Sequence, residues 1–86
     1  MVNYSIEVSA TAEKQLRKLS QKDKISVLKR IQELGREPRP DRSRKLRGQD
    51  NIYRVRVGNY RVLYSIENKR LIIIILKVGH RRDVDR

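Results

Sequence analysis

The chain has 86 residues, of which 37% are hydrophobic, and its 22 Lys and Arg outnumber its 10 Asp and Glu to give a net charge of +12. This length makes one small domain over residues 1–86, and because Trp, Phe and Cys are absent its modest core must be aliphatic with some Tyr. The lack of Cys excludes disulfides and thiolate metal sites, and one His cannot build a histidine-based zinc site. The charge implies a polyanionic partner, either nucleic acid, an anionic membrane surface or an acidic protein, unless the basic surface serves solubility alone.

The start of the chain lacks a basic segment followed by an apolar stretch, so we predict no signal peptide. The longest apolar run, Leu71 to Leu76, is too short to cross a bilayer. We therefore expect a cytoplasmic protein without a membrane partner.

The first part of the chain predicts a strand and a short helix. Val2–Val8 alternates weakly, as a half-buried strand does. Ser9 offers an N-cap for a helix that ends near Ser20. The apolar residues of this helix recur at helical spacing: Ala12, Leu16 and Leu19.

A second helix is predicted directly afterwards. Ser20 to Asp23 has the form of a capping box, and Gly35 suits the C-terminus of the helix. Pro38 and Pro40 prevent the helix from continuing. The predicted apolar stripe of this helix consists of Ile25, Leu28, Ile31 and Leu34. The chain then enters a polar loop, Arg36–Arg47, whose further basic residues are Arg39, Arg42, Arg44 and Lys45.

Three strands are predicted in quick succession: Ile52–Val57, Tyr60–Ile66 and Arg70–Val78. The first two are separated by Gly58-Asn59, which suits a type II′ hairpin turn. The third is apolar on both faces, so we place it centrally in the sheet. The expected fold class is α+β, in the order β-α-α-β-β-β, with a small antiparallel sheet and a two-helix hairpin packed on one face.

The two-residue turn fixes the register of the hairpin, so that Arg56 faces Arg61. Alternation then places Arg54, Arg56 and Arg61 on one face of the sheet. Like charges that lie directly opposite each other destabilise a strand pair by a few tenths to about 1 kcal/mol. Neither strand contains an acidic residue. An external anion would relieve the repulsion, and the planar fork of arginine suits phosphate; a face made basic for solubility is the alternative.

The last strand returns antiparallel to its neighbour, so Gly79, His80, Arg81 and Arg82 should emerge beside Arg61 and the hairpin turn. Cations from three segments then converge at one end of the sheet. His80, the only histidine, is either incidental there or a member of the cluster.

Four blocks of the chain resemble, in order and spacing, those of the RelE/ParE toxin superfamily: Lys45-Leu-Arg-Gly48, Tyr53-Arg-Val-Arg-Val57, Tyr60-Arg-Val-Leu-Tyr64 and Val78-Gly-His-Arg-Arg82. The resemblance covers essentially the whole chain, and the basic residues look like those of the RelE branch. It implies a toxin that binds in the ribosomal A site, cuts mRNA there and is held inactive by a cognate antitoxin. The ParE branch shares the fold and is associated with inhibition of DNA gyrase.

The resemblance also implies roles for single residues. Arg61 matches an arginine that contacts the scissile phosphate, and Arg81 matches one that supports the leaving group. Arg54 and Arg56 match a basic pair, and His80 occupies a position that is often basic. The RNA-binding residues that we expect are Lys45, Arg47, Arg54, Arg56, His80 and Arg82.

The implied chemistry needs neither metal nor cofactor. RNA cleaves itself when its 2′-OH attacks the adjacent phosphate, giving a 2′,3′-cyclic phosphate and a free 5′-OH. Positioned arginines can align this attack and stabilise the developing charge. Because the pKa of arginine exceeds about 12, the proton transfers fall to another group, to the ribosome, or are managed by electrostatics.

One position departs from the family pattern. RelE-like chains commonly carry Tyr in a segment reading like Asp-Val-Tyr, where this chain has Asp83-Val84-Asp85. Asp85 cannot stack on a base and brings negative charge close to RNA, so we predict reduced activity. The chain is then naturally weakened or altered for low toxicity; a third interpretation makes Asp85 itself a catalytic base, against which its repulsion from phosphate argues.

Three functions stay open at this point: an endoribonuclease, a gyrase-targeting toxin without a catalytic site, and a binding module for an acidic antitoxin that represses its own operon. The expected partners are a RelB-like acidic antitoxin, mRNA with the ribosomal A site, and operator DNA only through the antitoxin complex. An antitoxin helix would cover apolar residues of the helix pair and of the central strand, and its acidic residues would meet the loop at Arg39–Arg47.

Overall fold

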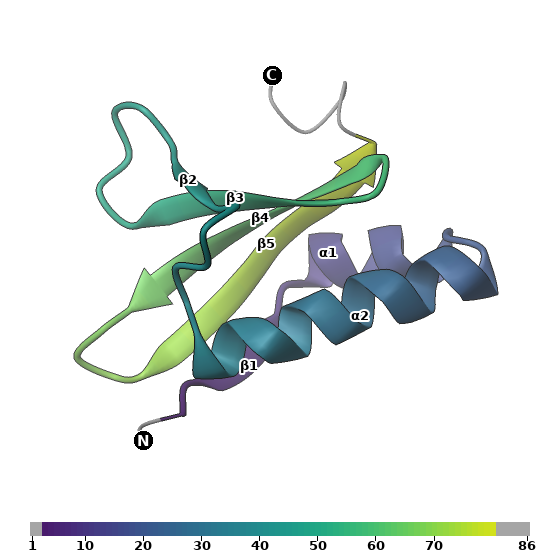
Figure 1. Ribbon diagram of the computed structural model, residues 1–86. Helices are drawn as coiled ribbons and strands as arrows, with labels where there is room; N and C mark the ends of the chain where they lie inside the picture. The colour runs from purple at the N-terminus through teal and green to yellow at the C-terminus, as the bar shows by residue number, and fades with distance from the viewer. Residues whose placement is uncertain (1–2, 81–86) are drawn as a thin grey trace.

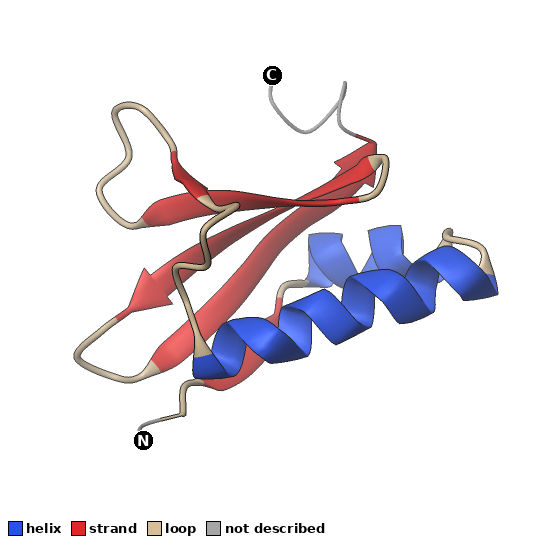
Figure 2. Cartoon of the chain, viewed as in Figure 1, coloured by secondary structure: helices blue, strands red, loops and turns tan. Residues whose placement is uncertain are grey.

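The computed structural model describes residues 3–80 and has two helices on one face of a five-stranded sheet (Figure 1). In chain order the elements are β1 (Ser5–Val8), α1 (Ala10–Arg17), α2 (Gln21–Arg36), β2 (Arg44–Lys45), β3 (Ile52–Val57), β4 (Tyr60–Glu67) and β5 (Ile72–His80). The strand order is β1-β5-β4-β3-β2, so β5 has a neighbour on each side as expected. Both helices lie on the same side of the sheet, so within residues 3–80 no helix covers the other face (Figure 2). The expected α+β fold with a helical hairpin is confirmed.

The sheet differs from the expectation in two respects. β1 pairs with β5 in parallel, so the sheet is mixed and not purely antiparallel. Both helices and the other strands lie between β1 and β5 in the chain. A connection of this length allows two neighbouring strands to run in the same direction, whereas a tight turn makes them antiparallel. In addition, the basic loop contains a two-residue strand, β2, which pairs antiparallel with β3.

Serine side chains cap both helices, as the sequence predicts. The Ser9 hydroxyl accepts a hydrogen bond from the backbone N–H of Ala12 at 3.1 Å, and the Ser20 hydroxyl accepts one from that of Asp23 at 3.2 Å. Each cap satisfies a backbone donor that the first helical turn leaves without a partner. The caps therefore fix where each helix begins.

The buried face of α2 is not the predicted one. Val27, Ile31 and Leu34 are buried, whereas Ile25 is 57% exposed and Leu28 is 37% exposed. The predicted stripe takes every third residue of the helix. Each step of three residues falls about 60° short of a full helical turn, so the stripe moves around the helix by that angle. A stripe of that spacing leaves the core within two steps, so the prediction was wrong for Ile25 and Leu28.

The core lies between the helices and the sheet, and α2, β4 and β5 each contribute three of its described residues. Among them Tyr64, Ile73 and Ile75 are fully buried. Burial of each such aliphatic side chain stabilises the fold by about 1.5–3 kcal/mol. The middle of the sheet is therefore a rigid platform for whatever its open face carries.

The β3–β4 hairpin has the predicted register. Val57 faces Tyr60 and Arg56 faces Arg61. Gly58 has φ of 60° and Asn59 does not have positive φ, as a type II′ turn requires. The turn that the sequence predicts thus sets the arginines opposite each other.

A bulge at Leu76 interrupts the pairing of β4 with β5. Leu63 pairs with Lys77 and Tyr64 pairs with Ile75, so Leu76 is the extra residue. Ser9 holds the bulge, since its hydroxyl donates to the Leu76 carbonyl at 2.9 Å and its backbone N–H donates to the Ile75 carbonyl. The bulge turns Lys77 away from the core and onto the open face.

Candidate nucleic-acid interface

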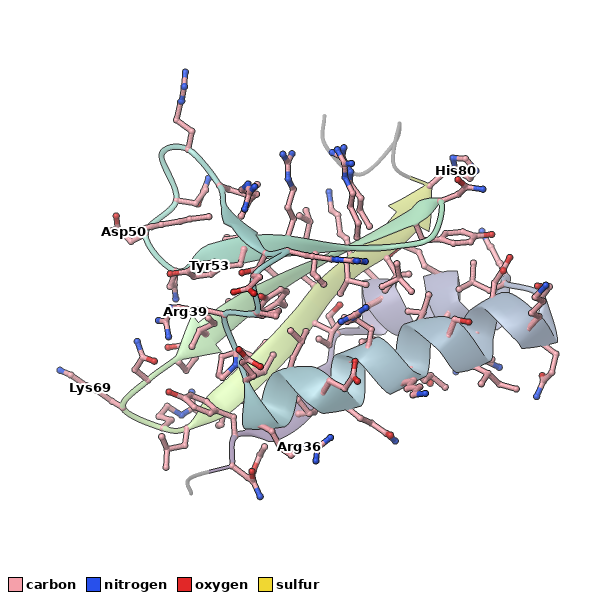
Figure 3. The ribbon with its side chains drawn as sticks, viewed as in Figure 1. Arg36, Arg39, Asp50, Tyr53, Lys69 and His80 are labelled. Carbon is pink, nitrogen blue, oxygen red and sulfur yellow. The ribbon has the colours of Figure 1, made fainter. Side chains whose placement is uncertain are left out.

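The open face of the sheet carries two rows of cations. Across the strands, Arg44 lies opposite Arg54, and Arg54 lies opposite Leu63. One row further along, Arg56 lies opposite Arg61, whose partner on β5 is Gly79. Nitrogen-tipped side chains stand on the side of β2 and β3 that faces away from the helices (Figure 3). Three strands therefore contribute positive charge to one surface.

Four of these residues enclose a hollow. Its described lining consists of Arg42, Arg44, Arg54 and Arg56, and its volume is about 190 Å³. Nη1 of Arg44 donates to the carbonyl oxygen of Ser43 at 3.1 Å, which ties the guanidinium to its own loop. Guanidinium groups bind oxyanions through paired hydrogen bonds, so this hollow is a candidate site for an oxyanion.

Arg61 differs from its neighbours because it is buried, with only 7% of its surface exposed. Arginine stays charged in proteins, so the buried guanidinium is a permanent positive charge next to Arg56. Burial also restricts the Arg61 side chain to few conformations, so its guanidinium is a hydrogen-bond donor in a fixed position. A fixed cation in a site of low dielectric interacts strongly with any anion that approaches it.

His80 belongs to a different surface from the arginines. Its ring meets that of Tyr60 edge-on, with centroids 5.6 Å apart, and the Tyr60 hydroxyl donates to Oδ2 of Asp23 at 3.0 Å. That hydrogen bond raises the pKa of Tyr60. His80 also lines a hollow of about 380 Å³ together with Asp23 and Ser26 of α2. We expected His80 beside Arg61, but alternation along β5 puts Gly79 there and turns His80 toward Tyr60.

The structure gathers only part of the expected RNA-binding set. Arg54 and Arg56 line the arginine hollow, whereas Lys45 lies opposite Tyr53 and so on the other side of β2 from Arg44. Arg47 is exposed in the loop after β2 and is not among the lining residues. Arg81, Arg82 and Asp85 lie outside the described residues.

Sequence reasoning missed three cations of the open face: Arg42, Arg44 and Lys77. The sequence predicts Arg42 and Arg44 only as residues of a basic loop, because a two-residue strand is too short to show a periodic pattern. Lys77 reaches this face through the bulge, which falls inside a continuous apolar run. The sequence signal that could have identified Arg42 and Arg44 was their position shortly before β3, the first strand of the hairpin.

Two stacked tyrosines hold the loop that carries Arg42 and Arg44. The rings of Tyr53 and Tyr64 stack with centroids 6.0 Å apart, and the Tyr64 hydroxyl donates to the Pro38 carbonyl at 2.7 Å. Burial raises the pKa of Tyr64 to about 12. Nε of Arg39 donates to the Tyr53 hydroxyl at 3.1 Å, which raises the pKa of Arg39, and its guanidinium lies over the ring at 5.3 Å. The loop is thus attached to the core before β2 begins.

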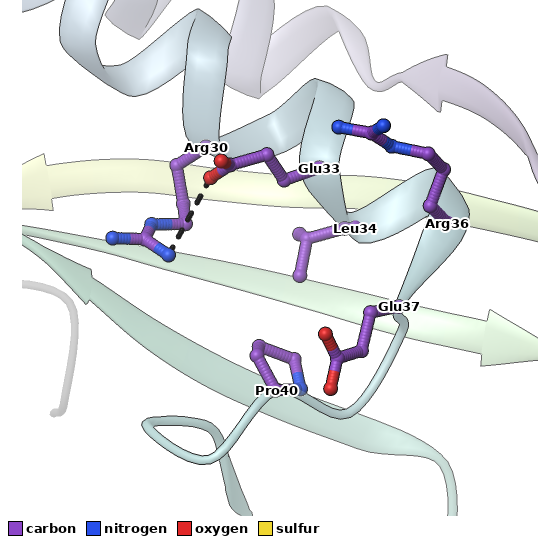
Figure 4. Close-up of a pocket in the computed structure, with 6 residues that line it drawn as sticks. All are labelled: Arg30, Glu33, Leu34, Arg36, Glu37 and Pro40. Carbon is purple, nitrogen blue, oxygen red and sulfur yellow. Dashed lines mark ion pairs between the residues drawn. The ribbon is translucent and has the colours of Figure 1, made fainter.

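A larger hollow of about 450 Å³ lies where α2 ends, between Leu34 and Pro40 (Figure 4). Its charges are mixed: Arg30 pairs with Glu33 at 3.5 Å, and Arg36 and Glu37 also line it. Carboxylates at this position repel a polyanion. The arginine hollow is therefore the better candidate for contact with nucleic acid.

Within residues 3–80 no group of three or more His, Cys, Asp or Glu is placed to hold a metal ion. No helix in the described part of the chain is both long and apolar enough to span a membrane.

Known proteins match this chain over nearly all of its length. The family model described as the ParE toxin of the type II toxin–antitoxin system parDE matches residues 6–85. Toxin RelG of Mycobacterium tuberculosis is 34% identical over 88 residues, covering 96% of this chain and 97% of RelG. The chain therefore belongs to the ParE toxin family of type II toxin–antitoxin systems, within the RelE/ParE superfamily that its sequence blocks resemble.

Two solved toxin–antitoxin complexes contain a chain with the same fold. The toxin–antitoxin complex RelBE2 from Mycobacterium tuberculosis matches with a TM-score of 0.82 and 32% identity, covering 93% of this chain and 100% of that one. The archaeal RelE–RelB complex from Pyrococcus horikoshii matches with a TM-score of 0.83 and 31% identity, covering 96% and 100%. Both neighbours are bound to antitoxins.

Proposed function

We propose that this toxin is a ribosome-dependent endoribonuclease that cuts mRNA in the A site and thereby halts translation. The observation that carries the proposal is the pair Arg56 and Arg61, which face each other on the open side of the sheet. Two opposed cations attract a phosphate, and the names of the relatives associate this fold with RelE-type toxins.

In the proposed reaction Arg61 contacts the scissile phosphate. The 2′-OH attacks the adjacent phosphorus while the bond from phosphorus to the 5′ oxygen breaks. One proton leaves the 2′ oxygen and another reaches the 5′ oxygen. Arg56 and Arg61 would stabilise the additional charge on the phosphate oxygens, an effect that costs little reorganisation because Arg61 is already fixed by burial.

Residues outside the described part would complete the site. Arg81 would stabilise the leaving oxygen, and Arg82 would bind RNA. Asp85, where RelE-like chains commonly carry Tyr, would weaken contact with the nucleotide, so the proposed activity is a reduced one. No metal or cofactor takes part in this scheme.

A second candidate is inhibition of DNA gyrase, which the sequence resemblance associates with the ParE branch; the matching family model is described as the ParE toxin. The two functions predict different cellular damage. After induction, primer extension on a translated message should reveal cuts within codons if the toxin is an endoribonuclease. DNA breaks with an SOS response and an intact message would identify the gyrase inhibitor and reject our proposal.

The proposed regulation is neutralisation by a RelB-like acidic antitoxin, in keeping with the complexes formed by the structural neighbours. The net charge of +12 suits such a partner. Operator DNA would be bound only through the antitoxin complex. The proposed location of the toxin is the cytoplasm, where its substrate is translated.

A further inference from the structure

The hollow formed by Arg42, Arg44, Arg54 and Arg56 continues the cationic face from Arg56, which the proposed cleavage uses, to Arg42 and Arg44, which it does not use. We propose that this arginine hollow is a second phosphate subsite, which holds a backbone phosphate of the RNA next to the one that reacts at Arg61. The inference rests on the proposed function for its choice of RNA as ligand. Arg42 and Arg44 are the residues that it newly assigns.

The register of the strands separates the two phosphate positions. Arg54 and Arg56 are two residues apart on β3, so they point to the same face with a spacing of about 7 Å. Arg44 lies across from Arg54, and Arg61 lies across from Arg56. The pair Arg44 and Arg54 forms one cationic row, and the pair Arg56 and Arg61 forms the neighbouring row. Because Arg56 also lines the hollow, it borders both phosphate positions. A chain with regularly spaced phosphates can place one phosphate on each row.

The chemistry of the lining favours a single oxyanion. All four described lining residues are arginines, whose planar forks bind phosphate oxygens in pairs. At about 190 Å³ the hollow is smaller than the pockets that hold drug-sized ligands, which have volumes of about 300–1,000 Å³. It therefore has room for a phosphate group and leaves the attached sugar and base outside.

Hydrogen bonds within the loop and to the core hold the hollow in shape before a ligand binds. The Ser43 hydroxyl donates to the Pro40 carbonyl at 2.8 Å, and the Ser43 carbonyl accepts from Arg44. The hydrogen bond from Tyr64 to Pro38 anchors the start of the same loop in the core. Loop contacts that exist beforehand lower the entropic cost of binding. The loop therefore acts as a positioning segment for Arg42 and Arg44.

The test compares the double variant Arg42→Ala/Arg44→Ala with a control that loses the same charge, Arg36→Ala/Arg70→Ala. Arg36 and Arg70 are both exposed and lie outside the open face. Binding of inorganic phosphate is followed through the arginine side-chain signals in NMR spectra. Binding of a single-stranded RNA whose 2′ oxygens are methylated, and so cannot react, is followed by fluorescence anisotropy at one fixed salt concentration.

We expect the hollow variant, Arg42→Ala/Arg44→Ala, to bind inorganic phosphate and the methylated RNA about ten- to a hundredfold more weakly. The reason is the loss of charge-assisted hydrogen bonds to phosphate oxygens. The control should change either affinity by less than about threefold. Equal losses in the two double variants would overturn the proposal, because they would show a general effect of charge. Loss of phosphate binding with unchanged RNA binding would overturn the assignment to RNA and identify a site for free phosphate.

These measurements need neither ribosomes nor cleavage, so they can fail independently of the proposed function. If wild-type toxin leaves ribosome-bound mRNA intact while the hollow variant still loses affinity for the oligonucleotide, the endoribonuclease proposal fails and the subsite stands. If mRNA is cut and the hollow variant binds both ligands normally, the subsite alone is rejected.

Discussion

Arg56 and Arg61 are directly opposed across the β3–β4 pair, one exposed and the other only 7% exposed. Directly opposite residues of an antiparallel pair have Cβ atoms about 4.5–5.5 Å apart, so the two cations repel each other in the folded state. An anion bound between the two guanidinium groups would relieve this repulsion.

Replacement of Arg56 by Gln should raise the free energy of unfolding by about 0.2–1 kcal/mol at low salt, because it removes the repulsion and keeps a polar side chain. Added salt should shrink the gain, since exposed charges are screened. Urea denaturation measures the difference. Inorganic phosphate should stabilise the wild type more than Arg56→Gln; equal stabilisation of both would contradict a bound anion at this pair.

Replacement of Tyr64 by Phe should lower the free energy of unfolding near neutral pH by about 1 kcal/mol, because the hydrogen bond to the Pro38 carbonyl is lost. The pH dependence should also change. Folded protein holds the Tyr64 proton up to a pKa of about 12, whereas the unfolded chain releases it near 10, so the folded state binds more protons in this range.

The wild type should consequently lose stability relative to Tyr64→Phe as pH rises from 10 toward 12, by up to about 1.4 kcal/mol per pH unit. Denaturation of both proteins at several alkaline pH values would test this difference. A constant difference between them across the range would show that the Tyr64 hydroxyl is not buried as described.

Replacement of Asp23 by Asn should lower the pKa of Tyr60 toward its ordinary value of 10.0, because the hydrogen bond to the carboxylate is the main cause of the raised pKa. Ultraviolet titration of the tyrosines would measure the change, and Tyr60→Phe would identify which step of the titration belongs to this residue. A Tyr60 titration that is the same in Asp23→Asn and wild type would rule out the contact between α2 and the hairpin.

Replacement of Asp85 by Tyr should raise the rate of mRNA cleavage on programmed ribosomes by roughly tenfold, since stacking of an aromatic ring on a base contributes about 1–3 kcal/mol. Asp85→Ala serves as the control for removal of the negative charge alone. Equal rates for wild type, Asp85→Ala and Asp85→Tyr would show that this position does not limit activity.

The sequence predicted the structure correctly where residues close together in the chain determine the geometry. Ser9 and Ser20 marked the helix starts, and the Gly58-Asn59 turn fixed the register that opposes Arg56 and Arg61. Each of these features depends on residues close together in the chain. The arrangement of the hairpin could therefore be predicted without any knowledge of distant contacts.

Other features depended on contacts between distant segments and were missed. Nothing in an unbroken apolar run marks Leu76 as a bulge, because either face of β5 would be apolar there; the bulge is held by Ser9 from the other end of the chain. Arg44 joins the cationic face only because it pairs with β3. The orientation of His80 toward Tyr60 likewise depends on the pairing of β4 with β5.

The central claim is tested most directly by cleavage of mRNA on programmed ribosomes with wild-type toxin, Arg61→Met and the double variant Arg36→Ala/Arg70→Ala. Methionine fills part of the buried space of Arg61 without its charge, and circular dichroism verifies that each variant is folded. We predict 5′-OH fragments from the wild type and the double variant, and a loss of at least about a hundredfold with Arg61→Met. Cleavage by folded Arg61→Met at the wild-type rate would contradict the assignment of catalysis to the arginine face.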